Sequence, residues 1–250
     1  MSVDGTFTQQ SKLHASDAAA ADFFGHSVSL YDDTALIGAP HNAGNGPLGS
    51  GSVYVFTRSS SDGTFSQHSK LYASDATVED YFGMSVSLYG DTALIGTIYD
   101  DDNDKSNSGS VYVFTRSSTD GTFTERSKLH ASNAAVWDRF GISVSLYGNT
   151  ALIGAHGRDD DNDNTIKNVG SVYVFKAPIV CSTNEYVSSH VCTPCDPGTT
   201  NDAGDDAWGS DTACTATSCS ANERVLSHVC TTCPPGTTNA AGDDLSLIHI

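Results

Sequence analysis

Two runs of consecutive acidic and amide residues, 100–104 and 159–163, are the segments of this sequence best suited to bind a metal ion. Each run places carboxylates at alternate positions, and Ca²⁺ takes about six to eight oxygen ligands, several of which one loop can supply. The candidate ligands are Asp100, Asp102, Asp104, Asp159, Asp161 and Asp163. The sixth position of the runs holds Lys105 and Asn164 instead of the glycine of a calcium loop. A weak calcium site and a merely solvated acidic loop therefore both stay open.

Seven cysteines, all after residue 180, are the second group that could do chemistry. They are Cys181, Cys192, Cys195 and Cys214, followed at a 38-residue spacing by Cys219, Cys230 and Cys233. Zinc ribbons combine two Cys-x-x-Cys pairs, whereas each pair here has outlying cysteines of its own. The surrounding sequence is polar and poor in core residues, which favours disulfides and an oxidising compartment. The repeat counterpart of Cys214 would fall just beyond residue 250, so we expect the odd count of cysteines to reflect truncation.

The formal net charge of −18 at pH 7 limits the classes of partner. Nucleic acids and anionic lipids need a basic surface, so we exclude both. No G-x-S-x-G, H-E-x-x-H or phosphate-loop motif occurs, and no apolar run approaches the length of a membrane span. We therefore predict a protein without catalytic activity.

A repeat of 58 residues runs through the sequence up to residue 176, and its fold must position the two acidic runs. The dipeptide Phe-Gly occurs at 24–25, 82–83 and 140–141, and each copy continues with Ala-Leu-Ile-Gly and Gly-Ser-Val-Tyr-Val-Phe. Each copy contains four short strand-like segments with tight turns, in the first copy 26–30, 34–38, 51–56 and 64–73. Repeated four-stranded units of this kind predict an all-β fold of β-propeller blades. A β-solenoid is the alternative, but its coils usually lack Asp-Gly hairpins.

The order Phe-Gly-x-Ser-Val, Ala-Leu-Ile-Gly-Ala-Pro, Gly-Ser-Val-Tyr-Val-Phe resembles the FG-GAP repeat, the blade of integrin α-subunit propellers and of many secreted proteins. The resemblance implies a partial β-propeller of three four-stranded blades over residues 1–176. Only the first copy keeps the complete Gly38-Ala39-Pro40. Integrin blades carry their calcium motif in the first–second loop, which is only a short turn here.

After a linker at 177–180, the repeat of 181–244 resembles the ephrin-receptor-like and tumour-necrosis-factor-receptor-like cysteine-rich modules of extracellular stalks. This resemblance implies a small disulfide-rich tail in which Cys181 pairs with Cys192 and Cys195 with Cys214. Its second repeat is incomplete.

The two ends of the sequence fit neither repeat completely. Residues 245–250 match a common sequencing adapter, and we exclude them as a scar. Residues 6–14 repeat the sequence of a fourth strand, and no signal peptide follows Met1. We expect a signal peptide upstream and a longer array of blades.

Alternate connections of an antiparallel blade share one face, and here the second–third loops and the interblade segments vary between copies. Loops on a rigid scaffold commonly bind partners, and the integrin resemblance points to the same face. The candidate partner-binding residues are His41, Tyr99, Trp137, Asp138, Arg139, His156 and Arg158. We predict a secreted or cell-surface adhesion module for an extracellular protein or glycan. The alternatives are drift in unconstrained loops and an accessory propeller of a larger secreted hydrolase.

Overall fold

The computed structural model describes most of the chain up to residue 178 and parts of the cysteine-rich tail. The described residues are 5–43, 46–101, 105–158, 168–178, 181, 183–188, 191–196, 199–204, 212–216, 221, 223–226 and 229–232. The chain divides into two compact units, Met1–Lys176 and Ala177–Ile250. Strands are the regular elements of the described residues, and none of these residues belongs to a helix able to cross a membrane. The all-β prediction is confirmed.

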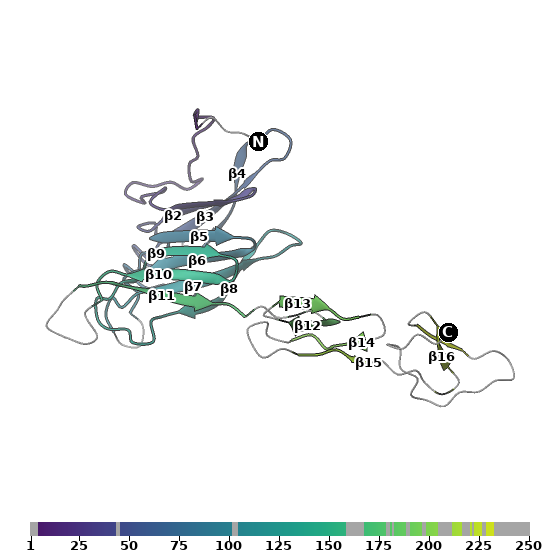
Figure 1. The fold of residues 1–250 in the computed structure, drawn as a ribbon. Coiled ribbons are helices and arrows are strands. Elements are labelled where there is room, and N and C mark those ends of the chain that lie inside the picture. The colour runs from purple at the N-terminus through teal and green to yellow at the C-terminus, as the bar shows by residue number, and fades with distance from the viewer. Residues whose placement is uncertain are drawn as a thin grey trace. The chain divides into compact units, whose positions relative to one another are not determined.

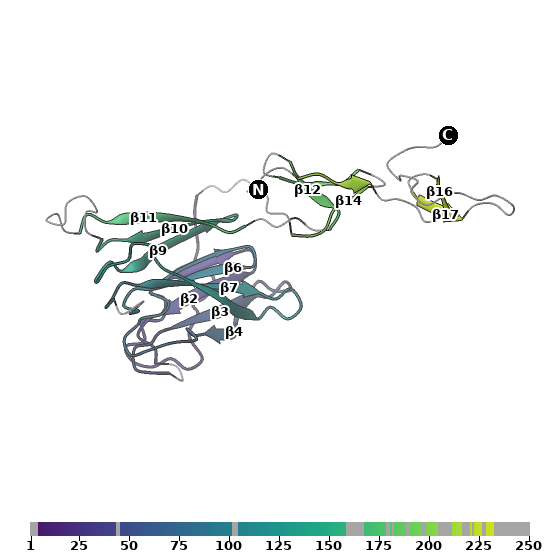
Figure 2. The ribbon, with the colours of Figure 1, turned by 90° about the horizontal axis from the view of Figure 1, so that it is seen from below.

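The first unit is a stack of antiparallel sheets, each formed by one copy of the repeat (Figure 1). The first sheet contains β1 (Val28–Tyr31), β2 (Thr34–Ala39), β3 (Ser52–Arg58) and β4 (Phe65–Leu71) in that order. The second contains β5 (Ser85–Tyr89), β6 (Thr92–Thr97), β7 (Ser110–Arg116) and β8 (Phe123–Leu129). The third contains β9 (Phe140–Tyr147), β10 (Thr150–Ala155) and β11 (Ser171–Lys176). The view from below shows β9, β10 and β11 along one side of the stack (Figure 2).

The third sheet has three strands in the described residues. The chain continues from β11 into the cysteine-rich unit, and no fourth strand pairs with β11 among the residues that the structure describes. Residues 7–14, which repeat the sequences of β4 and β8, form no strand, because they have no neighbouring strand to pair with.

Apolar side chains that alternate along each strand form the core between neighbouring sheets. Val53 and Val55 of β3 point toward the second sheet and pack in one cluster with Val86 and Leu88 of β5. The next interface repeats this arrangement with Leu94 and Val111 of the second sheet against Ile153 of the third. The sheets therefore stack face to face, as blades of a propeller do.

Glycine is required where the backbones of neighbouring sheets touch. A Cβ atom on Gly38 would lie 2.1 Å from the carbonyl oxygen of Gly83, which also accepts a hydrogen bond from Ser27 Oγ at 2.8 Å. Gly96 approaches Gly141 in the same way in the next interface. The Phe-Gly and Leu-Ile-Gly motifs thus recur because they form the joint between blades.

The cysteine-rich unit consists of short hairpins joined by disulfides. Its strands are β12 (Glu185–Ser188), β13 (Val191–Pro194), β14 (Thr199–Thr200), β15 (Thr215–Ala216), β16 (Glu223–Leu226) and β17 (Val229–Thr232). Disulfides join Cys181 to Cys192 and Cys195 to Cys214, the pairs that the resemblance implied. Cys230 is also disulfide-bonded, while Cys219 and Cys233 lie outside the described residues.

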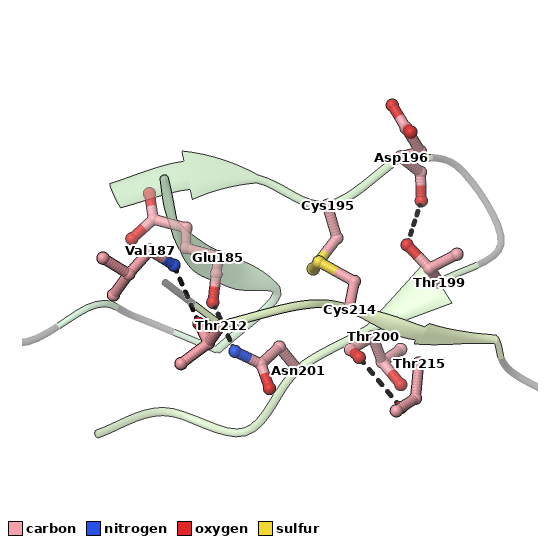
Figure 3. Close-up of a disulfide and its surroundings, with 10 residues drawn as sticks. All are labelled: Glu185, Val187, Cys195, Asp196, Thr199, Thr200, Asn201, Thr212, Cys214 and Thr215. Atoms are coloured by element: carbon pink, nitrogen blue, oxygen red, sulfur yellow. Dashed lines mark hydrogen bonds between the residues drawn. A yellow bond between two sulfur atoms is a disulfide. The ribbon is translucent and has the colours of Figure 1, made fainter. Parts of the chain in front are cut away.

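Polar side chains around the second disulfide hold its hairpins together (Figure 3). Thr212 Oγ1 accepts a hydrogen bond from the Val187 amide at 2.9 Å, and Asn201 Nδ2 donates one to the Glu185 carbonyl at 2.9 Å. In the described part of this unit Val187 packs with Cys181 and Cys192 in a small apolar cluster, so covalent bonds and hydrogen bonds supply much of the stabilisation.

Candidate functional site

The variable loops of the first unit meet at one end of its strands. The antiparallel order places the loops after β2, β6 and β10 at the same end as the segments that join one sheet to the next. We call this the variable-loop end. The hairpin turns between β1 and β2, β5 and β6, and β9 and β10 lie at the opposite end, the constant-turn end.

A row of aromatic side chains, which we call the ring ladder, crosses the variable-loop end. Its rings belong to Phe23, His41, Tyr81, Tyr99 and Trp137. Neighbouring ring centroids are 4.5, 4.4, 5.2 and 6.3 Å apart in that order, and the His41 and Tyr81 rings are stacked. These spacings are typical of favourable contacts between aromatic rings. The ladder takes its rings alternately from interblade segments and second–third loops.

Arg139 extends the ring ladder into the third copy. Its guanidinium carbon lies 5.5 Å from the centre of the Tyr99 ring and 5.7 Å from that of Trp137. Arg139 Nη1 lies 3.2 Å from His156 Nε2. Cation–π contacts of this kind hold a cationic side chain against exposed rings. The ladder thus spans all three copies as one surface.

The backbone holds the ladder residues in a conformation that is uncommon for residues other than glycine. Phe23, Tyr81 and Arg139 occupy the same repeat position, and their φ values are 55°, 60° and 55°. Left-handed φ costs about 1–2 kcal/mol per residue, so the surroundings must enforce it. The Tyr81 amide donates to the Gly49 carbonyl at 3.1 Å, and the Arg139 amide donates to the Asn107 carbonyl at 3.2 Å. Each interblade segment is thereby fixed to the second–third loop of the preceding copy.

A layer of buried polar residues supports the ladder from below. Asp22, Asp80 and Asp138 recur at one repeat position and are all buried. Each carboxylate accepts a hydrogen bond from a backbone amide three residues earlier, at 2.8, 2.6 and 2.7 Å respectively. These bonds close the turn from which the next ladder residue projects.

The residue that neighbours this aspartate differs in charge between the copies. In the first copy, Asn42 Nδ2 donates to Asp22 at 2.8 Å. In the third, Arg158 forms a salt bridge with Asp138 at 3.2 Å. Asp138 and Arg158 were predicted as partner-binding residues, but both side chains are buried and lie beneath the surface that a partner would contact.

In the second copy the corresponding residue is Asp100, which places two carboxylates in one buried layer. Burial raises the pKa of Asp80, and the charge of Asp100 raises it further. Lys128 Nζ lies 2.9 Å from Asp100 and 2.8 Å from Asp75 and offsets part of this repulsion. Burial alone would raise the pKa of Asp75, but hydrogen bonds from Lys128 and Tyr112 lower it below its ordinary value.

Two shallow hollows lie on either side of Tyr81. One, of about 390 Å³, is lined by Tyr81, Tyr99 and Trp137 together with Glu79, Asp101 and Asn107. The other, of about 410 Å³, is lined in part by His41, Leu48, Glu79 and Tyr81. Both combine ring faces with hydrogen-bonding groups, which is typical of surfaces that recognise polar partners.

The proposed calcium ligands lie mostly beyond what the structure describes. Asp102, Asp104, Asp159, Asp161 and Asp163 are outside the described residues. Asp100 is described, and it accepts hydrogen bonds from Ser110 Oγ at 2.5 Å and from Lys128. Among the described residues, no group of three or more acidic, histidine or cysteine side chains is arranged to hold a metal ion. Calcium binding stays a prediction.

The sequence analysis named His41, Tyr99, Trp137, Arg139 and His156, and the structure brings these residues together. It omitted Phe23 and counted Tyr81 only as part of a variable interblade segment, and these two residues join the others into a continuous row. The sequence contains a signal for both residues. They stand directly before the Phe-Gly motif, at the repeat position that Arg139 occupies in the third copy.

Comparison with known proteins gives a family match over most of the first unit. A family model described as FG-GAP repeat matches residues 7–56, 65–114 and 123–175, which together exceed half of the chain. Among curated proteins, none matches the sequence significantly. The matched segments contain every residue of the ring ladder.

Proposed function

Because the chain belongs to the FG-GAP repeat family, we propose that residues 1–176 are a non-catalytic interaction module of a secreted or cell-surface protein. The module binds an extracellular protein or glycan through the ring ladder at its variable-loop end. The disulfides and the FG-GAP repeats point to an extracellular domain. FG-GAP propellers are typically non-catalytic, which supports binding as the role of this one.

The observation that carries the proposal is that the ring ladder is exposed at its two ends and half-buried between them, although its backbone is rigidly held. The Phe23 and Trp137 side chains are 56% and 52% exposed, yet both residues have left-handed φ values. Strained backbone that presents large aromatic groups to solvent is more typical of binding surfaces than of unconstrained loops. Aromatic and arginine side chains also dominate the binding energy of protein interfaces.

Arrays of extracellular proteins and of glycans, probed with the complete fluorescently labelled chain, test this function. A Trp137→Ala/Arg139→Ser variant should lose binding to the hits by at least about tenfold, since interface hot spots contribute roughly 2 kcal/mol or more. Tyr147→Ala is the matched control, because it removes an exposed ring at the constant-turn end. Equal binding by both variants, or hits that depend on Tyr147 instead, would overturn the proposal.

A further inference from the structure

The two hollows beside Tyr81 are one site that recurs with the blade. We call the hollow of about 410 Å³, between the first and second copies, the first-joint hollow. The hollow of about 390 Å³, between the second and third copies, is the second-joint hollow. Eight of the nine residues that line the second-joint hollow have counterparts 58 positions earlier in the lining of the first-joint hollow. The internal joint between two copies therefore produces the hollow, and each joint repeats it.

The equivalent positions carry different side chains in the two hollows. The residues of the second-joint hollow are Tyr99, Asp101, Asn107 and Trp137, where the first-joint hollow has His41, Ala43, Gly49 and Glu79. The second-joint hollow thus gains a carboxylate, an amide and an indole ring, and it offers a ligand more contacts than the first-joint hollow does.

The polar groups of the second-joint hollow are fixed by the backbone, whereas their ends remain available to a ligand. Glu79 is exposed and has a φ of 64°, and its amide donates to the Leu48 carbonyl at 3.0 Å. Asp101 Oδ1 accepts a hydrogen bond from the Asn107 amide at 2.7 Å. Within the described residues, neither the Glu79 carboxylate nor the Trp137 indole nitrogen has a hydrogen-bond partner. Groups that are held in place before binding lose little entropy when a ligand arrives.

The charges around the second-joint hollow favour a neutral ligand. An anion would meet the carboxylates of Glu79 and Asp101 and the net charge of −18. Arg139 does not line the hollow, but its guanidinium already lies 5.5 and 5.7 Å from the centres of the Tyr99 and Trp137 rings, so a cation on these rings would meet a like charge. A neutral hydroxyl group can donate to the carboxylates and also accept from the amide and indole N–H groups.

The ring surfaces and their repetition point to a polymer of sugar units. Trp137 is 52% exposed, and Tyr81 and Tyr99 are half-buried beside it. A sugar ring has C–H groups on its faces and hydroxyl groups at its rim, so it packs on aromatic rings while it makes hydrogen bonds to groups around them. Neighbouring sheets pack about 10 Å apart, so the site recurs at a short distance. A ligand made of repeated units fits such a site better than the irregular surface of a folded protein does.

We therefore propose that the two hollows are consecutive subsites for one neutral oligosaccharide. This inference rests on the proposed function and narrows its ligand from a protein or glycan to a glycan. One sugar unit packs on Tyr99 and Trp137 in the second-joint hollow and donates hydroxyl hydrogen bonds to Glu79 and Asp101. A neighbouring unit occupies the first-joint hollow beside His41. Glu79 lines both hollows and contacts both units.

Variants of the complete chain separate the contributions of the subsites. Asp101→Ala/Asn107→Gly gives the second-joint hollow the residues found at these positions in the first-joint hollow, so the fold should be kept. Glu79→Gln keeps the shape of the side chain and removes its charge from both hollows. Asp32→Asn is the matched control, because Asp32 is also exposed and acidic and has a φ of 53°, but it lies at the constant-turn end.

An array that carries neutral, acidic and amino-sugar oligosaccharides beside extracellular proteins identifies what the labelled chain binds. Calorimetry with the bound sugars, from one unit to six, then measures the affinities. We expect neutral oligosaccharides to bind, and two or more units to bind more tightly than one. Glu79→Gln and Asp101→Ala/Asn107→Gly should each weaken binding about tenfold, as expected for a lost hydrogen bond to a charged group. Asp32→Asn should leave the affinity unchanged.

The other outcomes distinguish this inference from the proposed function. Binding confined to acidic or amino sugars would overturn the inference, as would neutral binding that does not respond to Glu79→Gln. Equal affinity for one unit and for longer sugars would overturn the pair of subsites. Binding to a protein but to no neutral sugar, with sensitivity to Trp137→Ala/Arg139→Ser, would overturn the inference and leave the proposed function in place. A chain that binds nothing on the array would overturn both.

Discussion

The constant-turn end and the variable-loop end of the first unit each carry a row of aromatic rings, but the sequence specifies the two rows in different ways. At the constant-turn end the row consists of Tyr31, Tyr89 and Tyr147, one identical residue from each copy, with centroids 5.0 Å apart at both steps. At the variable-loop end the ring ladder combines phenylalanine, histidine, tyrosine and tryptophan. Repetition of one residue explains the first row, whereas the second requires a different residue to fit at each step.

The ends also differ in how strictly the backbone constrains the sequence. In the constant turns one left-handed position holds Asp32, Gly90 and Gly148, so glycine is dispensable there. At the variable-loop end Gly51 and Gly109 touch the backbone of the next interblade segment. The variable residues therefore stand on an invariant backbone framework, which is the arrangement expected of a binding surface.

The largest effect should come from breaking this framework. A Cβ atom on Gly109 would lie 2.2 Å from the Phe140 carbonyl oxygen, and the residue has a φ of 80°. Overpacking and left-handed strain together predict that Gly109→Ala lowers the free energy of unfolding by about 4 kcal/mol. Gly90→Asp, which copies Asp32, should cost less than about 1 kcal/mol. Urea titration followed by circular dichroism measures both, and equal losses would refute the difference between the ends.

The next effect concerns the buried layer beneath the ring ladder. Arg158→Ala would leave the Asp138 carboxylate buried without its ion partner, and breaking a buried pair in this way costs about 3 kcal/mol. Arg158→Asn should recover part of this loss, because Asn42 makes the corresponding hydrogen bond in the first copy. Thermal unfolding of the three proteins checks the order. A smaller loss for alanine than for asparagine would contradict it.

Sequence analysis predicted the elements of this fold better than its surface. The strands and the all-β class follow from repeated residues, because the same local interactions recur in every copy. The continuity of the ring ladder does not follow in this way. The position of Arg139 over Tyr99 and Trp137 depends on how one sheet packs on the next. The burial of Asp138 and Arg158 likewise depends on tertiary contacts.

A smaller effect should appear in the pH dependence of stability. The pKa of Asp80 is raised in the folded state. The folded protein therefore binds more protons than the unfolded protein at pH values between the unfolded and the folded pKa. Stability therefore decreases as the pH rises through this window. Asp100→Asn removes the neighbouring charge and should make this dependence on pH shallower. Asn42→Asp places a second carboxylate beside Asp22 and should make it steeper.

Urea titrations between weakly acidic and neutral pH measure these slopes. Asp17 and Asp75 have lowered pKa values, so their contribution is lost as the pH falls through those folded values. The pKa values of both aspartates are lowered whereas that of Asp80 is raised, so their contribution is lost at a lower pH than that of Asp80. Identical slopes for the original protein and the two variants would rule out coupling between the carboxylates.

The smallest predicted effect tests whether the acidic loops give the variable-loop end an affinity for calcium. Extracellular calcium modules have Kd values of roughly 10⁻⁴–10⁻³ M, so binding at about 1 mM Ca²⁺ adds at least about 0.4 kcal/mol to stability. Calorimetry should detect heat that an Asp102→Ala/Asp161→Ala variant lacks. An Asp62→Ala/Asp120→Ala variant, changed at exposed turns of the opposite end, should keep it. Equal heats and melting temperatures for all three proteins would leave the runs as solvated acidic loops, and the ring ladder would then be the remaining candidate for recognition at that end.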